Sequence, residues 1–316
     1  MGRKGREIMK IVFMGTATFS QAVLKQLLDH NYPVSLIVTQ PDSYVGRKKQ
    51  VKMPEVKVMG IENNIEVYQP VNIKKEYQRI LDEQPDLIIT AAYGQIIPKK
   101  ILEAPRLGCV NVHASLLPKY RGGAPVHKCI IDDEKETGVT IMYMASKMDA
   151  GNIIKQRSTP ILDSDTVSVL YDRLSDIGAS LLIDTLPSIL DGTNDSIPQD
   201  ETKVTYARTI QHEDEHLSFD QTSRKVDCFV RGLNAWPVAY SSYNGLNIKI
   251  WAGHVVEYQG EEKPGTIVNI TKKTMIVKTT DGAYAIDELQ VPGKKKMRIL
   301  DYLNGNSIFE TGKEFE

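Results

Sequence analysis

This chain has few cysteines, almost no net charge and no long apolar run, and each shortage excludes a class of protein. The three cysteines among 316 residues, Cys109, Cys129 and Cys228, are scattered. Without C-x-x-C spacing they argue against a disulfide framework or a zinc site. The formal net charge is −1, so no overall field attracts nucleic acid or an anionic membrane. No apolar stretch is long enough to span a bilayer. We expect a cytoplasmic globular protein.

Glycine is also scarce where a dinucleotide site would need it. The apolar strand predicted at 10–14 runs into Gly15 and Thr16, whereas the fingerprint G-x-G-x-x-G needs three glycines in this turn. A nicotinamide or flavin site is therefore not expected. The turn still places backbone N–H groups at a helix start, so it could line a pocket.

One metal-like motif is present. His212–His216 matches H-E-x-x-H, which binds zinc only on an amphipathic helix with a third ligand. The segment is intensely acidic, and neither the apolar face nor a suitably spaced ligand accompanies it. We expect a solvated turn and no metal.

Apolar strands alternate with helical patterns through the first two thirds of the chain. Strands are predicted at 10–14, 35–39, 86–92, 110–113 and 139–144. Such alternation indicates an α/β fold with a doubly wound, mostly parallel, Rossmann-like sheet. A long helix is predicted at 166–190.

The pattern changes after this helix. Residues 191–207 have the polar composition of a linker. Short alternating segments between 238 and 289, separated by turn residues, predict a small antiparallel β-barrel of the OB type. We therefore predict an N-terminal extension (1–9), a catalytic domain (10–190), a linker (191–207) and an OB-like domain (208–316).

Asn111 and His113 form the most informative pair. Alternate side chains of a strand share a face, so the two would project together from the strand at 110–113. An amide donor beside an imidazole suits a carbonyl that becomes an oxyanion while a proton moves. The alternative is a turn-capping asparagine and a satisfied, half-buried histidine.

Asp149 follows the strand predicted at 139–144, in Met148-Asp149-Ala150-Gly151. Functional residues gather at the carboxyl ends of strands in open parallel sheets. Asp149 could therefore orient His113 and stabilise its charge. It could equally be a simple turn residue.

Two basic clusters lie far apart in the sequence. One contains Arg47, Lys48 and Lys49, and the other contains Lys294, Lys295 and Lys296. Each could be a solvated surface, or could contact the phosphates that supply most nucleic-acid affinity.

Together these segments resemble the methionyl-tRNA formyltransferase family, within the folate-dependent formyltransferases, from Lys10 to about Leu303. The resemblance rests on these segments: Lys10–Thr16, Thr39–Asp42, Ala92–Gly94, Asn111–Pro118, Arg121–Pro125, Glu136–Met142, Met148–Gly151, Asn234–Pro237 and Pro292–Lys295. Asn-x-His with Ser-Leu-Leu-Pro is typical of folate-dependent formyltransferases generally, and the basic loop and C-terminal barrel favour the tRNA enzyme.

The resemblance implies that Asn111, His113 and Asp149 are the catalytic trio. It implies that Ser115, Leu116, Leu117 and Pro118 bind the donor, 10-formyltetrahydrofolate. Arg47, Lys48 and Lys49, with Lys294, Lys295 and Lys296 in the second domain, would bind initiator methionyl-tRNA. We expect a monomer that carries no metal.

The chain departs from the family pattern at Ala17-Thr18, at Ser43 and at Lys48. The alternatives left open are an acceptor such as glycinamide ribonucleotide or an amino-sugar nucleotide, hydrolysis of the formyl folate, and an RNA-binding module with a decayed catalytic domain.

Overall fold

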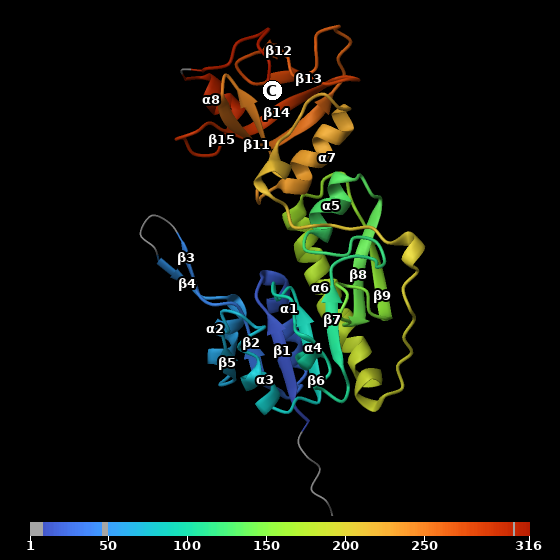
Figure 1. Ribbon diagram of the computed structural model, residues 1–316. Coiled ribbons are helices and arrows are strands. Elements are labelled where there is room, and N and C mark those ends of the chain that lie inside the picture. The colour runs from blue at the N-terminus through green and yellow to red at the C-terminus, as the bar shows by residue number, and fades with distance from the viewer. Residues whose placement is uncertain (1–8, 46–49, 306) are drawn as a thin grey trace, which may run out of the picture. The chain divides into compact units, whose positions relative to one another are not determined.

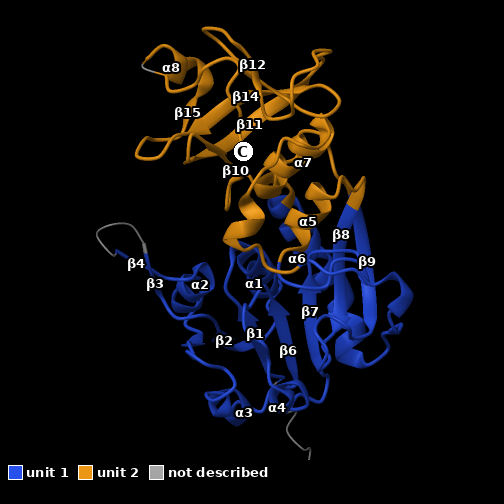
Figure 2. Ribbon diagram, turned by 45° about the horizontal axis from the view of Figure 1, so that its top comes forward, with its two compact units in different colours: residues 1–123, 137–159, 171–207 blue, residues 124–136, 160–170, 208–316 orange. Residues whose placement is uncertain are grey.

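The computed structural model describes residues 9–45, 50–305 and 307–316. The chain forms two compact units (Figure 2). Unit 1 comprises residues 1–123, 137–159 and 171–207, and unit 2 comprises 124–136, 160–170 and 208–316. Residues 191–207, where we predicted a linker, thus belong to unit 1. Within the described ranges, no helix is both long and apolar enough to cross a membrane.

Unit 1 is built on a seven-stranded sheet in the order β5-β2-β1-β6-β7-β8-β9 (Figure 1). The strands are β1 (Ile11–Gly15), β2 (Val34–Val38), β5 (Glu66–Tyr68), β6 (Leu87–Ala91), β7 (Cys109–His113), β8 (Glu136–Tyr143) and β9 (Ile153–Pro160). The strands from β5 to β7 pair in parallel, and β8 pairs antiparallel with β7. The predicted Rossmann-like, mostly parallel fold is confirmed.

Helices connect the parallel strands because such crossovers must bury both faces of the sheet. They are α1 (Thr18–Asp29), α2 (Glu55–Glu62), α3 (Gln78–Asp82) and α4 (Lys99–Leu102). The long helix α6 (Val167–Asp191) follows β9, and its residues from Tyr171 onward belong to unit 1. Every residue of β1 and β6 is buried. On α1, the Phe19 ring contacts Tyr171 of α6 edge to face, with 5.8 Å between centroids.

Three local features differ from the sequence-based expectation. β9 was not predicted, because most of its side chains are exposed or only partly buried and it carries no apolar alternation. The basic loop is flanked by a short hairpin of β3 (Ser43–Val45) and β4 (Gln50–Lys52). The sequence pattern predicts a helix over residues 73–83, but α3 begins only at Gln78. The N–H of Ile73 donates instead to the Gln95 side chain.

Unit 2 contains a second sheet, in which every pairing is antiparallel. Its strands are β10 (Tyr240–Tyr243), β11 (Leu246–Val256), β12 (Ile267–Ile270), β13 (Met275–Lys278), β14 (Ala283–Gln290) and β15 (Met297–Arg298). Register shifts around Trp251 interrupt the long β11–β14 pairing, and such bulges bend a sheet. The result is an antiparallel half-barrel. The short strands predicted a small antiparallel β-barrel, and the antiparallel architecture of this domain is confirmed.

Helices fill and flank this half-barrel. They are α5 (Pro125–Ile131), α7 (Ser223–Leu233) and α8 (Ile299–Leu303), and unit 2 also contains the 3-10 turn η2 (His212–Glu215). A second 3-10 turn, η1 (Glu201–Lys203), belongs to unit 1. Thr222 caps α7 by accepting a hydrogen bond from the Lys225 N–H. Val226 and Val230 of α7 then reach the same core as Tyr284 of β14.

Candidate active site

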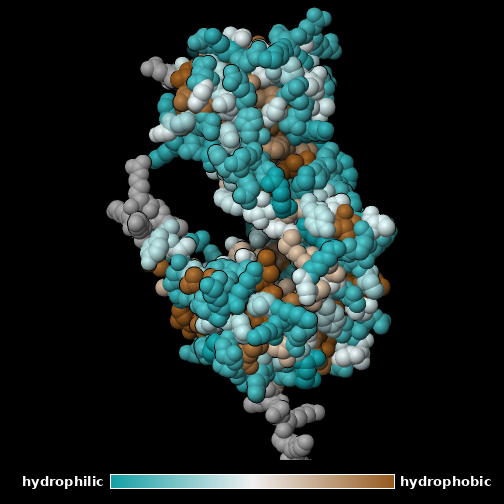
Figure 3. Space-filling model, in the orientation of Figure 1, coloured by the Kyte–Doolittle hydropathy of each residue, from teal (hydrophilic) through white to brown (hydrophobic). Residues whose placement is uncertain are grey.

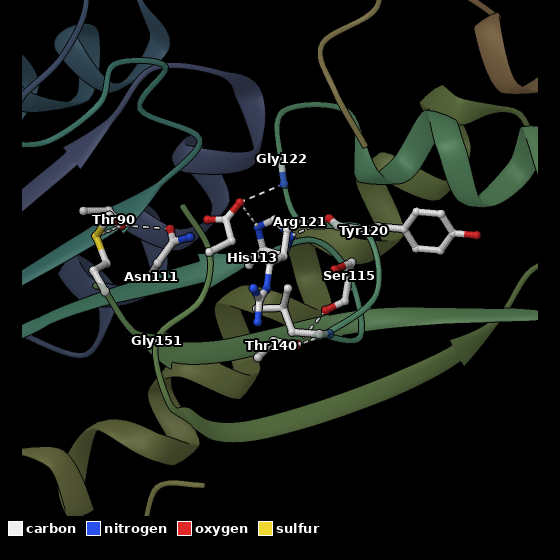
Figure 4. A network of polar contacts seen from close by, with 12 residues as sticks. Thr90, Asn111, His113, Ser115, Tyr120, Arg121, Gly122, Thr140 and Gly151 are labelled. Atoms are coloured by element: carbon white, nitrogen blue, oxygen red, sulfur yellow. Dashed lines mark hydrogen bonds and ion pairs between the residues drawn. The ribbon is translucent and has the colours of Figure 1, made fainter. Parts of the chain in front are cut away.

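Asn111 and His113 project from β7, the strand whose neighbours are β6 and β8 (Figure 4). In register, Asn111 lies beside Thr90 of β6, and His113 lies beside Thr140 of β8. The Thr90 hydroxyl donates to Asn111 Oδ1 at 2.8 Å. This bond fixes the carboxamide with its oxygen toward Thr90, and Nδ2 has no hydrogen-bond partner among the described residues. Asn111 therefore keeps a preoriented N–H₂ donor.

His113 is buried, with 6% of its surface exposed. Its Nε2 lies 3.1 Å from the main-chain carbonyl oxygen of Tyr120. A carbonyl only accepts, so Nε2 must carry the hydrogen. The neutral ring then has its lone pair on Nδ1, which lies 3.9 Å from Asp149 Oδ2. That distance is too long for a hydrogen bond but places a carboxylate next to the nitrogen that can gain a proton.

Asp149 sits in a turn closed by a 3.3 Å bond from the Ala150 N–H to the Lys147 carbonyl. Its φ is 49°, in the left-handed region, which is uncommon for residues other than glycine, asparagine and aspartate. Its Oδ2 accepts a hydrogen bond from the Gly122 N–H at 2.8 Å (Figure 4). The carboxylate is thus held by the main chain of the loop that follows Tyr120.

Gly151 allows the chain to leave this turn. A Cβ at this position would lie 1.8 Å from the Tyr143 carbonyl oxygen. Only a residue without a side chain permits this approach of two backbones. The Met148-Asp149-Ala150-Gly151 motif therefore combines an acid with the glycine that lets the turn close.

The Ser115–Pro118 loop is braced by residues of the next two strands. Thr140 Oγ1 donates to the Ser115 carbonyl at 2.6 Å and accepts from the Leu117 N–H at 3.1 Å. Gln156 Nε2 donates to the Leu117 carbonyl at 2.9 Å. The side chains of Ser115 and Leu117 are buried, whereas Leu116 and Pro118 are partly exposed. Leu116 and Pro118 are thus the members of this loop whose side chains a ligand can contact.

A cavity of about 740 Å³ opens in unit 1 after the ends of β1 and β6, a size typical of small-molecule sites. Its lining residues are Thr16, Ala17, Gln40, Val71, Asn72, Ile73, Lys74, Ala92, Tyr93, Gly94, Gln95 and Ile96. The turn at Thr16 thus lines a pocket, as the sequence suggested. Hydrophobic residues interrupt the mostly hydrophilic surface (Figure 3). Two exposed hydrophobic side chains line this cavity, Val71 with 75% of its surface exposed and Ile96 with 70%.

Two carboxamides hold the cavity walls together. Gln40 Nε2 donates to the Tyr93 carbonyl at 3.1 Å, and Gln95 Nε2 donates to Gln40 Oε1 at 3.1 Å. Gln95 Oε1 in turn accepts from the Ile73 N–H at 2.9 Å. These bonds tie the loops after β2, β5 and β6 to one another.

The predicted basic residues fall into two groups. Arg47, Lys48 and Lys49 lie outside the described residues. In unit 2, Lys294 Nζ lies 4.7 Å from the centre of the Tyr302 ring. Lys296 Nζ lies 4.8 Å from the Trp251 ring and 2.6 Å from a Glu288 carboxylate oxygen. Lys295 is exposed and makes no ion pair or ring contact with the described residues.

The sequence alone did not identify five residues that support the site. They are Thr90, Gln95, Tyr120, Thr140 and Gln156. Each acts through a hydrogen bond to a residue distant in sequence or to the backbone, and no local pattern marks such a role. The segment Arg121-Gly122-Gly123 contributed to the family resemblance, but its sequence gave no sign that the Gly122 N–H contacts the Asp149 carboxylate.

Comparison with known proteins shows which families this chain matches. The formyl transferase family matches residues 9–186, and the C-terminal domain of formyl transferases matches residues 209–307. A methionyl-tRNA formyltransferase from Staphylococcus aureus is 48% identical over 308 residues, covering 96% of this chain and 99% of that protein.

Solved structures share the fold at low identity. An N-formyltransferase from Helicobacter canadensis, in complex with folinic acid and dTDP-3-aminofucose, superimposes with a TM-score of 0.69 at 20% identity, over 88% of this chain and 98% of that one. HypX from Aquifex aeolicus, in complex with tetrahydrofolic acid, gives 0.66 at 18% identity, over 92% of this chain and 46% of that one.

Proposed function

Because this chain belongs to the methionyl-tRNA formyltransferase family, we propose that it transfers a formyl group from 10-formyltetrahydrofolate to the α-amino group of methionine on initiator methionyl-tRNA. The observation that carries the proposal is identity over nearly the whole of both chains. The fold alone does not choose the acceptor, since a structural neighbour binds an amino-sugar nucleotide.

The reaction defines what the site must do. The folate supplies a formyl group carried on its N10. A bond forms between the methionine nitrogen and the formyl carbon, the bond from that carbon to N10 breaks, and one proton moves from the amine to N10. The formyl oxygen gains negative charge in between. The protein must therefore supply a donor to that oxygen and a group that accepts and returns a proton.

Asn111 suits the first task. Its carboxamide is oriented by Thr90 before any substrate arrives, so its Nδ2 donor needs no reorganisation as charge develops on the formyl oxygen. A preorganised donor of this kind is usually a large term in acyl transfer.

His113 suits the second task through Nδ1. With Nε2 engaged by Tyr120, Nδ1 is the ring nitrogen that can take the proton from the attacking amine and pass it to N10. The resulting imidazolium would lie beside the Asp149 carboxylate, 3.9 Å away, which stabilises the charged ring. Asp149 then acts electrostatically, while Tyr120 fixes the tautomer.

The remaining residues hold the substrates. The partly exposed side chains of the 115–118 loop would contact the folate. The cavity beside Thr16 and Tyr93 would receive another part of the substrates. Lys294, Lys295 and Lys296, together with Arg47, Lys48 and Lys49, would contact tRNA phosphates, which makes binding dependent on salt.

The test is to mix the protein with 10-formyltetrahydrofolate and methionine-charged initiator tRNA, and to measure N-formylmethionine on the tRNA. Product that disappears with His113→Ala supports both donor and acceptor. Free formate without formylated tRNA would instead indicate a hydrolase. Folate binding without either product would indicate that the acceptor is a different, small amine, and amino-sugar nucleotides would be tested first.

A further inference from the structure

Gln199 contacts the turn that carries Asp149, although it lies 50 residues further along the chain. Its Nε2 donates to the Asp149 carbonyl at 2.7 Å and to the Gly151 carbonyl at 2.8 Å. Gln199 belongs to the segment we predicted as a linker. Its side chain thus holds the backbone carbonyls on both sides of Ala150.

The other end of the same carboxamide is held by Arg121. Gln199 Oε1 accepts from Arg121 Nε at 3.0 Å and from Arg121 Nη2 at 2.8 Å. A primary carboxamide has two donor hydrogens and two acceptor lone pairs, and all four are used here. Because the guanidinium only donates and the two carbonyls only accept, the amide can adopt just one orientation.

Arg121 is fully buried, at 0% exposure. Its carboxylate partner is Glu201, at 2.7 Å from Nη2, and its Nη1 has no hydrogen-bond partner among the described residues. Burying a guanidinium is costly, and a well-packed apolar side chain would often stabilise a fold as well or better. Stability alone therefore does not explain this choice of residue.

The position of Arg121 in the chain supplies an explanation. The preceding residue, Tyr120, gives the carbonyl that engages His113, and the following residue, Gly122, gives the N–H that engages the Asp149 carboxylate. The main chain of Arg121 is itself fixed to the 205–207 segment by two hydrogen bonds, at 2.9 and 2.8 Å. One residue thus connects both partners of the His113–Asp149 pair, through its neighbours and through Gln199.

We propose that Arg121 and Gln199 are positioning residues for formyl transfer, which hold the Asp149 carboxylate opposite His113 Nδ1. This inference rests on the proposed function. Asp149 needs such support because its left-handed backbone, which aspartate adopts more readily than most residues, still carries more strain than it would for glycine. It also makes no hydrogen bond to His113 that could align the pair by itself. Gln199 therefore links the segment after α6 to the proposed catalytic residues.

Two variants of Gln199 distinguish the effect of losing its two donated hydrogen bonds from the effect of losing all four of its hydrogen bonds. Gln199→Glu keeps an acceptor for Arg121 but replaces both donor hydrogens with a carboxylate oxygen facing two carbonyls. Gln199→Met removes all four bonds at similar volume. Each should lower kcat by about 10-fold or more with little change in either KM, since small misplacements at a reacting centre are that costly. Lys203→Ala is the matched control, because Lys203 is exposed in the same segment and pairs only with Asp200 among the described residues; it should keep wild-type kcat.

A double-mutant cycle distinguishes positioning from a general structural role. If Gln199 acts through Asp149, Gln199→Met should cost less than about 2-fold in kcat once Asp149→Ala is present. An equal loss in both backgrounds would overturn the inference, as would near wild-type kcat for Gln199→Glu and Gln199→Met. Should these variants fail to fold, Arg121→Lys keeps the buried charge without the two-nitrogen contact and is put through the same cycle. If Asp149→Ala itself turns over like the wild type, the proposed role of Asp149 fails instead.

Discussion

His113 Nε2 lies 3.1 Å from the carbonyl oxygen of Tyr120, seven residues further along the chain. This contact determines the neutral tautomer of the imidazole, because it assigns the hydrogen to Nε2 and leaves the lone pair on Nδ1, the nitrogen proposed as the base. A carbonyl is the right partner for this purpose, since it cannot donate and so admits no other neutral tautomer.

Replacing Asn111 with alanine should lower kcat by about 10²–10³-fold, or about 2.7–4 kcal/mol, the usual cost of deleting one oxyanion donor. Formylation of charged tRNA at saturating substrates measures it. Thr90→Val is a milder variant for comparison, because it removes the hydrogen bond that orients the Asn111 carboxamide but keeps the carboxamide itself. Losing one orienting hydrogen bond of about 1 kcal/mol predicts a loss near 5-fold. Near wild-type turnover by Asn111→Ala would rule out the oxyanion role.

The three lysines at 294–296 should contribute unequally to tRNA binding. Lys296 is paired with Glu288 at 2.6 Å, so part of its charge is already compensated, whereas Lys295 has no ion pair with described residues. We expect Lys295→Ala to weaken tRNA binding more than Lys296→Ala, and to reduce the slope of log Kd against log salt by about 1. Filter binding across a salt series tests this. Charge reversal at Arg47 and at all three lysines without loss of affinity would contradict the tRNA-docking proposal.

The stability of unit 2 should fall in mild acid because of His127. Burial lowers the pKa of its imidazole, although a hydrogen bond to the Trp236 carbonyl at 3.2 Å partly opposes this. With a folded-state pKa below the unfolded value of about 6.5, the unfolded chain binds more protons. Stability is therefore lost as the pH falls below the unfolded pKa. The urea midpoint of unfolding should be lower at pH 5.5 than at pH 7.5. The difference between the two midpoints should be smaller in His127→Gln than in the wild type. An unchanged pH dependence in the variant would show that other groups cause it.

Gly151→Ala should destabilise unit 1 by about 1–3 kcal/mol, the typical cost of forcing extra atoms into a packed site. The added Cβ would meet the Tyr143 carbonyl oxygen at 1.8 Å, and backbone cannot yield as a side-chain end can. Gly305→Ala is the control, since its nearest contact would be at 3.6 Å. Urea unfolding of both variants compares them, and equal midpoints would contradict the steric argument.

The sequence by itself determined the local features of this protein. The strand that carries Asn111 and His113 was evident from its apolar residues and from the period-two spacing that puts both side chains on one face. The alternation of apolar strands with helical patterns predicted a parallel sheet, and the almost purely apolar strand at 86–92 is typical of a strand that is covered on both faces. The resemblance of the matching segments indicated the family. The strand β9 was not predicted, because it lies at the edge of the sheet with most of its side chains exposed or partly buried, and such a strand needs no apolar alternation.

Only the tertiary structure decided how these residues act. The tautomer of His113 depends on the Tyr120 carbonyl, and the orientation of Asn111 depends on a hydroxyl from the neighbouring strand. The support of Asp149 comes from Gln199, in a segment whose polar composition resembled a linker. Each of these is a hydrogen bond whose partner is a backbone group or a residue far along the chain. Composition and periodicity report which face a side chain occupies, but the partner it meets there is set by the folding of other segments around it.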